Sequence, residues 1–336
     1  MVPVPFSLWA ARASGLASRY LAFLWHAYNP QNGHFRNFMG YDRRWLEEIG
    51  SQDSHARALR GLAAVLGRSR QDSLRWAAGR LFELTLPAAR DFTDLRPAAH
   101  TLVALQDYLT YFSGDRTAQE IRTLLAERLL AAFQGASSRD WPWFEDQLTY
   151  ANAALPHALL TCGHAMDRPA MVEMALASLD WLLTVQTSPA GHFAPVGNRG
   201  FYPRGGAMAR FDQQPIEAQA TVSACIEAYR ITSEQRWRHQ ARRAFQWFLG
   251  RNDVGVPLYD SATGGCCDGL SPDGVSFNQG AESTLAFLQS LAELRLLEQG
   301  VAADHHMARP TSREGVVAAF PEEEPVLRLG KVMSSE

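Results

Sequence analysis

The sequence has almost no lysine: Lys331 is the only one in 336 residues, and arginine supplies the remaining positive charge. The body of the chain therefore cannot carry a Schiff-base lysine. It also has no GxxxxGK[S/T] loop, which excludes a Walker-type nucleotide site. With a formal net charge of -3, the chain has no excess of positive charge for nucleic acid or for an anionic membrane.

Long apolar runs and paired cysteines are scarce as well. No apolar run reaches the roughly eighteen residues that a membrane span needs. Residues 1–20 have no basic segment ahead of their apolar part, so we expect no signal peptide and a cytoplasmic location. Four cysteines in a chain of this length do not make a disulfide framework, and Cys266–Cys267 has no second pair at zinc-ligand spacing. We therefore expect neither a metal nor another cofactor.

Helical periodicity runs through most of the chain, and strand-like alternation is rare, which argues against an α/β sheet protein. Ser51 or Asp53, Thr93 or Asp94, Asp115, Asp167 and Ser233 each precede an apolar-periodic run, and we expect a helix cap at each of these five places. The spacing predicts helices near residues 8–28, 53–67, 71–86, 94–112, 115–134, 147–165, 168–187, 215–231, 233–250 and 280–299.

The predicted helices are of two kinds. Those at 168–187 and 233–250 are bulky, with an apolar stripe and an arginine-bearing polar face, as is typical of an outer helix. Those at 147–165, 215–231 and 280–299 are rich in small residues and begin with polar groups. Such a helix is expected to be buried on most sides, with its polar start facing a cavity. The alternation of the two kinds predicts a series of helical hairpins.

An internal repeat supports the series of hairpins. Residues 32–45 and 190–204 share Gly-His-Phe followed by aromatic and arginine residues, and each precedes a helix that opens with an acid. Helical repeats with all long loops on one side form an open solenoid or a closed ring. Loops rich in Gly, Trp, Tyr and Phe favour a ring whose mouth is lined by these loops. We therefore expect an all-α toroid of the (α/α)6 type over residues 1–302. Five hairpins are clear, the N-terminal helix is a candidate for closing the ring, and residues 303–336 are expected to form an extended or disordered tail.

Acids and aromatic residues gather where the long loops meet the helices. Aromatic rings stack on sugars, polar groups bind sugar hydroxyls, and cleavage of a glycosidic bond needs one protonated and one ionised carboxyl group. The leading candidates for acid and base are Asp146 and Glu217, with Asp212, Glu282 and Asp53 as further candidates. The candidate substrate-binding residues are Trp141, Trp143, Tyr202, Arg204, Phe211, Gln214, Asn278 and His55.

The hairpins and four segments within them resemble the six-hairpin glycosidase superfamily over residues 10–300. The segments are SQDSHARAL, WPWFEDQLTYANAALPHALL, FDQQPIEAQA and GGCCDGLSPDGVSFNQGAEST. More closely, the chain resembles a bacterial group of toroid proteins encoded near, or fused to, glycosyltransferase domains. The resemblance implies a glycoside hydrolase or phosphorylase acting on an oligosaccharide, with a functional link to a glycosyltransferase. It is weaker for the reaction than for the fold, because one fold serves many activities.

Two other functions stay open. The first is a sugar epimerase or isomerase of the N-acylglucosamine-epimerase type, which would move protons with histidines; His55, His100 and His157 are available. The second is a glycan-binding partner of a glycosyltransferase that catalyses no reaction. Deuterium from the solvent in a free sugar would identify the epimerase, and saccharide binding without turnover would identify the binding partner.

Overall fold

A computed structural model describes residues 6–300 of the chain, and helices make up most of this part. The helices are α1 (Phe6–Ala27), α2 (Gln52–Arg68), α3 (Asp72–Thr85), α4 (Leu95–Tyr111), α5 (Arg116–Ala136), α6 (Ala154–Ala165), α7 (Pro169–Val185), α8 (Pro215–Thr232), α9 (Gln235–Gln246) and α10 (Ala281–Glu298). The strands form three short antiparallel pairs: β1 (Tyr28–Asn29) with β2 (His34–Phe35), β3 (Gln147–Leu148) with β4 (Tyr202–Pro203), and β5 (Gly269–Ser271) with β6 (Gly274–Ser276). The all-α prediction is confirmed, and the predicted tail at 303–336 lies outside the described residues.

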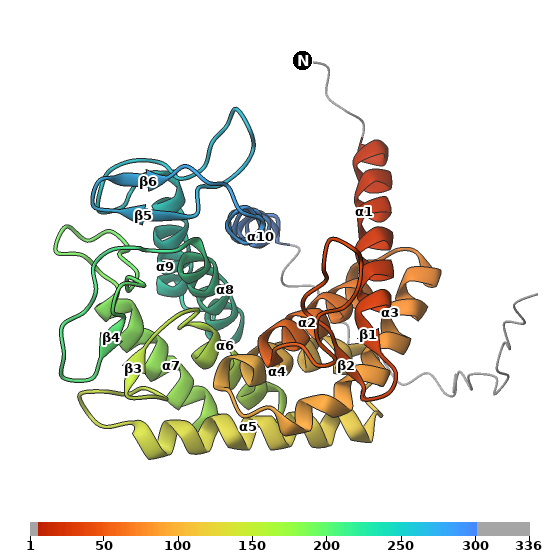
Figure 1. The fold of residues 1–336 in the computed structure, drawn as a ribbon. Coiled ribbons are helices and arrows are strands. Elements are labelled where there is room, and N and C mark those ends of the chain that lie inside the picture. The colour runs from red at the N-terminus through yellow and green to blue at the C-terminus, as the bar shows by residue number, and fades with distance from the viewer. Residues whose placement is uncertain (1–5, 301–336) are drawn as a thin grey trace, which may run out of the picture.

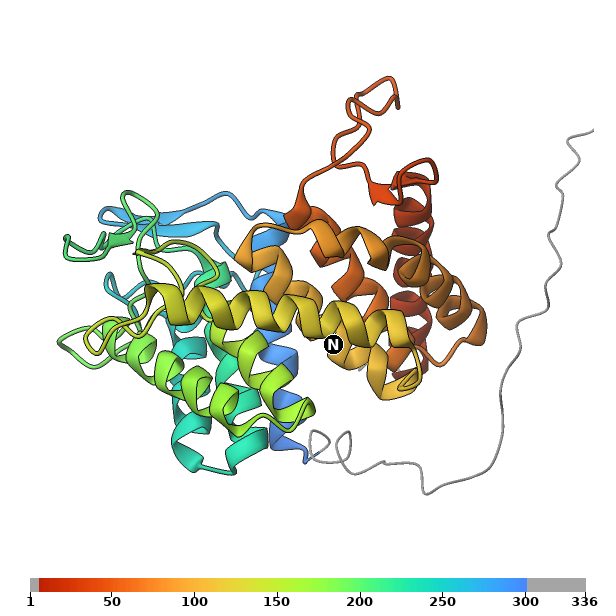
Figure 2. The same cartoon turned by 90° about the horizontal axis from the view of Figure 1, so that it is seen from below.

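The helices form two concentric layers. The inner layer consists of α2, α4, α6, α8 and α10, each packed against the next (Figure 1). The outer helices cover this layer from behind; α5, for example, runs across the outside of α4 and α6 (Figure 2). None of the helices within residues 6–300 is long and apolar enough to cross a membrane.

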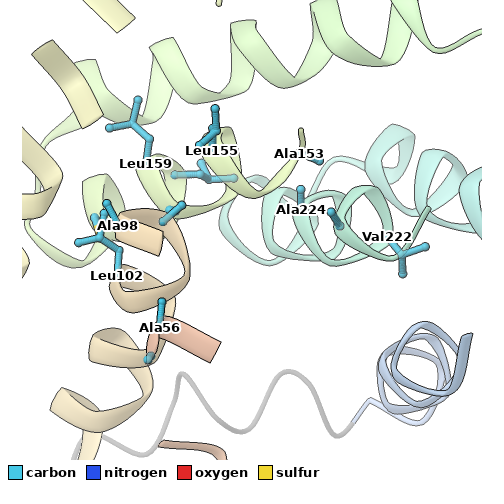
Figure 3. Close-up of a cluster of buried hydrophobic side chains, with 14 of the residues drawn as sticks. Ala56, Ala98, Leu102, Ala153, Leu155, Leu159, Val222 and Ala224 are labelled. Atoms are coloured by element: carbon cyan, nitrogen blue, oxygen red, sulfur yellow. The ribbon is translucent and has the colours of Figure 1, made fainter. Parts of the chain in front are cut away.

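Small residues let the inner helices approach one another. An inner helix has neighbours on both sides and an outer helix behind it, so residues 154–163 of α6 and 215–228 of α8 are all buried. Ala56 of α2 lies near Ala98 and Leu102 of α4, and α6 contributes Leu155 and Leu159 to the same cluster (Figure 3). This packing confirms the inner and outer roles that the helix compositions predicted.

The ring is open between α10 and α2 (Figure 1). These two helices are the ends of the inner layer, and residues 6–300 contain five hairpins and no sixth. The N-terminal helix α1 packs against α3 and α2 from outside. It therefore acts as an outer helix, and the expectation that it closes the ring is wrong.

Helix α6 begins at Ala154, later than the periodicity predicted. Residues Gln147 and Leu148 pair instead with β4 as a short strand. After this strand the Asn152 side chain accepts a hydrogen bond from the Thr149 backbone N–H at 2.9 Å, and Ala151 has a φ of 46°. A side chain that bonds to its own local backbone competes with helix formation, which explains the delayed start.

Side chains form two of the five predicted helix caps. Arg168 and Glu234 stand at the N-cap positions of α7 and α9, so the caps expected at Asp167 and Ser233 are wrong. The side chains of Ser51 and Asp115 each accept a hydrogen bond from the first turn of the following helix. Asp94 does not cap α4 with its side chain. Instead, Oε1 of Gln52 accepts hydrogen bonds from the backbone N–H groups of Thr93 and Asp94, at 2.9 and 3.2 Å. One glutamine therefore ties the starts of α2 and α4 together, and the capping role expected for Asp94 is wrong.

Candidate functional site

Residual exposure shows which faces of the inner helices line the central cup. On α6, which is otherwise almost sealed, small exposure remains at Ala154, His157 and Thr161, which are spaced three and four residues apart. Gln219 and Ser223 of α8 retain exposure with the same spacing. Residues three or four apart share one face of a helix, so these positions face the ring axis. Most of these slightly exposed positions carry polar side chains.

The deeper part of the cup holds two histidines and an arginine. Nη1 of Arg60 lies 3.4 Å from Nδ1 of His100. Arginine can only donate, so this nitrogen accepts and Nε2 of His100 carries the proton. That Nε2 is buried and has no hydrogen-bond partner in the described part of the chain. Burial, with Arg60 and other nearby positive charges, lowers the pKa of His100 well below its usual range. Burial lowers the pKa of His157, which lies within electrostatic reach of both, to about 3. Both rings are therefore neutral at pH 7.

The opposite wall of the cup is polar too. Gln219 donates to the Ser223 hydroxyl at 2.9 Å, and this hydroxyl donates to Glu293 of α10 at 2.7 Å. Further down α8, Glu227 pairs with Arg230 at 3.2 Å. Side chains from the inner helices thus meet in one hydrogen-bonded lining rather than in an apolar core.

At the mouth, the charges of two carboxylates act on one tyrosine. Oδ2 of Asp53 accepts a hydrogen bond from Nε of Arg57 at 2.7 Å, while its enclosed Oδ1 has no partner among the described residues. Burial raises the pKa of Tyr150, and the negative charges of Asp53 and Asp94 raise it further. Both carboxylates are thus within electrostatic range of Tyr150, a residue that is 38% exposed.

Arg96 fixes the loop that carries Tyr150. Its Nη1 donates to both carboxylate oxygens of Glu145, at 2.8 and 3.0 Å, and its Nε donates to the backbone carbonyl of Tyr150. The guanidinium also lies 4.9 Å from the centre of the Tyr150 ring. A cation over an aromatic face is attracted to it. Arg96 therefore positions both Glu145 and Tyr150 at the mouth.

Glu217 lies behind this loop and is 2% exposed. Its Oε2 accepts hydrogen bonds from Nδ2 of Asn152 at 2.9 Å and from Nε2 of Gln186 at 3.5 Å. Its Oε1 is buried and has no partner within the described residues. Burial raises the pKa of this carboxyl group above its usual value. In this position Glu217 holds the start of α6 from the outer-layer side and has little access to the cup.

The other candidate acids lie in loops or at the open side. Asp146 is 83% exposed at its side chain and pairs with Arg204 at 3.3 Å. Asp212 pairs with Arg199 at 2.5 Å. These pairs connect loop segments, since Arg204 also donates to the carbonyl of Ala136. Glu282 is exposed in the first turn of α10, next to the opening of the ring.

The candidate tryptophans are packing residues in this conformation. Trp143 is fully buried, with its ring centre 5.4 Å from that of Phe144 and 5.7 Å from that of Trp181. Trp141 packs against Tyr202, and its Nε1 donates to the carbonyl of Glu145 at 2.8 Å. The expectation that Trp143 stacks on a sugar is corrected here, because its ring has no exposed face.

The remaining candidates lie in three places: the core, the start of α10 and the loop before α8. His55 is a core residue: its Nε2 donates to the Thr85 carbonyl at 3.0 Å, and its Nδ1 accepts from the Phe35 N–H at 3.4 Å. Asn278 donates to Asp268, which also accepts from the N–H of Gly280 and so fixes the start of α10. The others, Phe211 and Gln214, are partly buried just before α8.

Asp94 and Tyr150 are the mouth residues that the list of sequence candidates omitted. Asp94 and Asp53 each stand at the start of an inner helix that is rich in small residues. This shared position is the feature of the sequence that could have identified Asp94 as a candidate. Capping is the commonest role for an acid at that place, and only the structure shows that Gln52 bonds the N–H groups at the start of α4.

We expect the stability of the fold to fall as the pH drops below about 6.5, because two core histidines are held neutral. Burial lowers the pKa of His55 to about 4 and that of His157 to about 3. A lowered folded pKa gives stability that is present above the unfolded value and is lost as the pH falls towards the folded value. At roughly 1.4 kcal/mol per unit, His55 alone accounts for a loss of about 3 kcal/mol.

Urea unfolding between pH 7 and pH 4 measures this loss. The wild-type chain should lose stability steeply, and His55→Gln should show a shallower slope. Equal slopes for the two chains would show that His55 takes up no proton on unfolding.

The sequence matches no protein-family model and none of the curated proteins. Solved structures share its architecture. An unsaturated glucuronyl hydrolase specific for heparin aligns with a TM-score of 0.61 and 12% identity over 88% of this chain and 82% of that chain. The α-1,6-mannanase from Salegentibacter sp. HEL1_6 aligns with a TM-score of 0.57 and 15% identity over 85% and 87%. The cellobiose 2-epimerase from Spirochaeta thermophila DSM 6192 aligns with a TM-score of 0.61 and 14% identity over 86% and 81%. At these identities the similarity concerns the fold alone: the chain shares the α/α-toroid architecture of these solved structures.

Proposed function

We propose that this chain is a carbohydrate-active enzyme that cleaves an oligosaccharide at the mouth of the cup, as a glycoside hydrolase or phosphorylase. One observation carries the proposal. Asp53 and Asp94, at the starts of neighbouring inner helices, both lie within electrostatic reach of the partly exposed Tyr150. Two carboxyl groups and an aromatic face are the groups that cleavage of a glycosidic bond requires. The fold supports the proposal, because the neighbours named above act on saccharides.

Each mouth residue has a role in this proposal. Arg57 binds Oδ2 of Asp53, whose side chain is 32% exposed and acts on the reacting atom or its water in this proposal. Asp94, which has no arginine partner in the described residues, donates the proton to the leaving oxygen. Tyr150 stacks on the sugar, and Arg96 holds its ring in place.

The acids first derived from the sequence stay candidates of lower rank. Glu217 would need the start of α6 to open before a substrate could reach it, because Asn152 covers it. Asp146 and Asp212 are already paired with arginines in the loops. Glu282 is free to contact a substrate that extends towards the open side of the ring.

Product analysis tests this proposal. The purified chain is incubated with manno-, gluco- and galacto-oligosaccharides, with and without inorganic phosphate, and the products are identified by mass spectrometry. Shortened saccharides would establish hydrolysis, and sugar phosphates that form only with phosphate would establish phosphorolysis. Products of unchanged mass, or no products from a saccharide that binds, would contradict the proposal.

An epimerase is the second candidate, because of the histidines in the deeper cup. His100 and His157 are neutral, lie near each other and flank Arg60. A neutral imidazole can take a proton from a carbon next to a carbonyl group, and an arginine can stabilise the resulting enolate. Turnover in D₂O distinguishes the two candidates, since an epimerase places deuterium in a sugar of unchanged length. A non-catalytic glycan-binding role predicts binding with neither outcome.

The cytoplasmic location, the bacterial origin and the link to a glycosyltransferase stay predictions from the sequence. The location would be tested by cell fractionation, and the link by co-purification with a glycosyltransferase from the same cells.

A further inference from the structure

Arg60 differs from the other arginines of the cup and its mouth, because it has no carboxylate partner among the described residues. Arg57, Arg96 and Arg230 each lie close to a carboxylate oxygen, at 2.7, 2.8 and 3.2 Å. Arg60 is partly buried on α2, and its one hydrogen bond within residues 6–300 joins Nη1 to Nδ1 of His100. Burial lowers the pKa of Arg60, since the guanidinium loses water without gaining an ion pair. Its remaining N–H donors are therefore free for a ligand.

The guanidinium of Arg60 lies among titratable groups from the other inner helices. Those within its electrostatic range include His100 and Asp107 of α4, His157 of α6 and Glu293 of α10. Helices α4, α6 and α10 occupy different places around the ring (Figure 1). A charge that acts on groups of all three therefore lies inside the ring, where a substrate in the cup can reach it.

His100 provides a second donor at the same place. Its Nδ1 accepts the hydrogen bond from Arg60, so its Nε2 carries the proton. This Nε2–H is buried and has no acceptor among the described residues, and the whole residue is only 5% exposed. A buried donor without an acceptor is costly. Arg60 and His100 together thus indicate a ligand that brings oxygen acceptors and a negative charge.

We propose that Arg60 and His100 bind the carboxylate of an acidic sugar, so that the substrate of the cup is an oligosaccharide that contains uronic acid. This inference rests on the proposed function, because it needs a saccharide in the cup. A guanidinium binds a carboxylate through two parallel N–H···O bonds, and the Nε2–H of His100 can donate another. Asp107 and Glu293 already lie within electrostatic range of Arg60. A ligand with a single negative charge therefore fits better than a doubly charged phosphate.

The depth of Arg60 also favours a group that the saccharide carries over a free anion. Arg60 follows Asp53 on the same helix, two turns or about 10 Å further along its axis. A phosphate ion that attacks the glycosidic bond has to contact the reacting carbon at the mouth, beside Asp53 and Asp94. An anion held two turns deeper is out of place for that attack. A carboxylate on a sugar unit that extends down the cup can reach Arg60.

Calorimetric titration of the full-length chain with matched saccharides at pH 7 tests the site. The probes are the trisaccharides of glucuronate and of galacturonate, each compared with its uncharged methyl ester. The wild type should bind one of the two acids at least about tenfold more tightly than its ester, because hydrogen bonds to charged groups are the strong ones. Arg60→Gln should bind acid and ester alike and keep its thermal stability, since the charge that it removes has no partner. Arg80→Gln is the matched control: Arg80 is 53% exposed on α3, and this variant should bind as the wild type does.

Three results would overturn the carboxylate site. If the wild type binds acid and ester equally, or binds neither acid, the cup does not recognise a carboxylate. If the preference for the acid persists in Arg60→Gln, the carboxylate binds elsewhere. If inorganic phosphate binds more tightly than both acids and loses its affinity in Arg60→Gln, the site holds a free anion instead.

Product analysis separates this inference from the proposed function. Cleavage of neutral oligosaccharides by a chain that binds no uronate would remove the inference and leave the function. Binding of a uronate through Arg60 without cleavage of any saccharide would support the site and contradict the function.

Discussion

Asp53→Asn is expected to lower the turnover of the chain's oligosaccharide substrate by about 10³-fold, within the 10²–10⁴-fold range of acid–base catalysis. The Asp53 carboxyl group, whose side chain is 32% exposed, acts on the substrate in this account. Asparagine keeps the size of the side chain, and its amide oxygen can still accept the hydrogen bond from Arg57. The fold should therefore be unchanged. Steady-state kinetics with a thermal-unfolding check measures both effects.

Two further variants complete this experiment. Asp94→Asn should cause a loss of similar size, because cleavage needs both carboxyl groups. Asp72→Asn is the matched control, since Asp72 also opens a helix but has a side chain that is 98% exposed on the outer layer. Its activity should equal that of the wild type. Full activity in both Asp53→Asn and Asp94→Asn would contradict the assignment. Asp146 and Glu217 would then be the leading candidates for the acid and the base.

Trp143→Ala should lower the free energy of unfolding by about 3–5 kcal/mol, the usual cost of emptying a buried tryptophan site. The ring of Trp143 is enclosed between Phe144 and the outer-helix residue Trp181, so its removal leaves a cavity beneath the loop that leads to α6. Urea unfolding at pH 7 measures the change.

An exposed tryptophan provides the control for this variant. Trp76 is 61% exposed on α3, and Trp76→Ala should change the stability by no more than about 0.5 kcal/mol. If Trp143→Ala kept its stability and lost affinity for saccharide, Trp143 would be a sugar-stacking residue, as the sequence first indicated.

The fold could be predicted from the sequence because local composition distinguishes inner helices from outer helices. The small residues of α8 allow neighbours on all sides, and the polar face of α9 does not. Such differences appear within one turn or two and need no knowledge of distant residues. The open sector was harder to foresee, because the position of α1 depends on its contacts with α2 and α3.

The site could be predicted only in part, since its roles depend on partners far away in the chain. Asp94 has the sequence context of a cap, but Gln52, more than forty residues earlier, bonds the N–H groups that Asp94 would have bonded. Glu217 looked free for catalysis and is instead covered by Asn152. The residues next to Asp94 or Glu217 in the sequence do not reveal such distant hydrogen-bond partners.

Aromatic residues illustrate the same limit. Tryptophans near an acid were read as sugar-binding residues, yet Trp143 fills a gap in front of Trp181. Tyr150 lies a few residues further on, and the cation over its ring and its 38% exposure make it the aromatic residue of the mouth. Composition gave the right kind of residue but not the one that faces the cup.

The most direct test of the account is the hydrogen-exchange footprint of a bound saccharide on the wild-type chain. The saccharide is the member of the oligosaccharide panel that binds most tightly. The account predicts slower exchange in residues 145–153 and in the first turns of α2 and α4, with no change on the outer helices α5 and α7. Protection confined to the loops before α8, or to the outer helices, would place the sugar elsewhere and contradict a site built on Asp53, Asp94 and Tyr150.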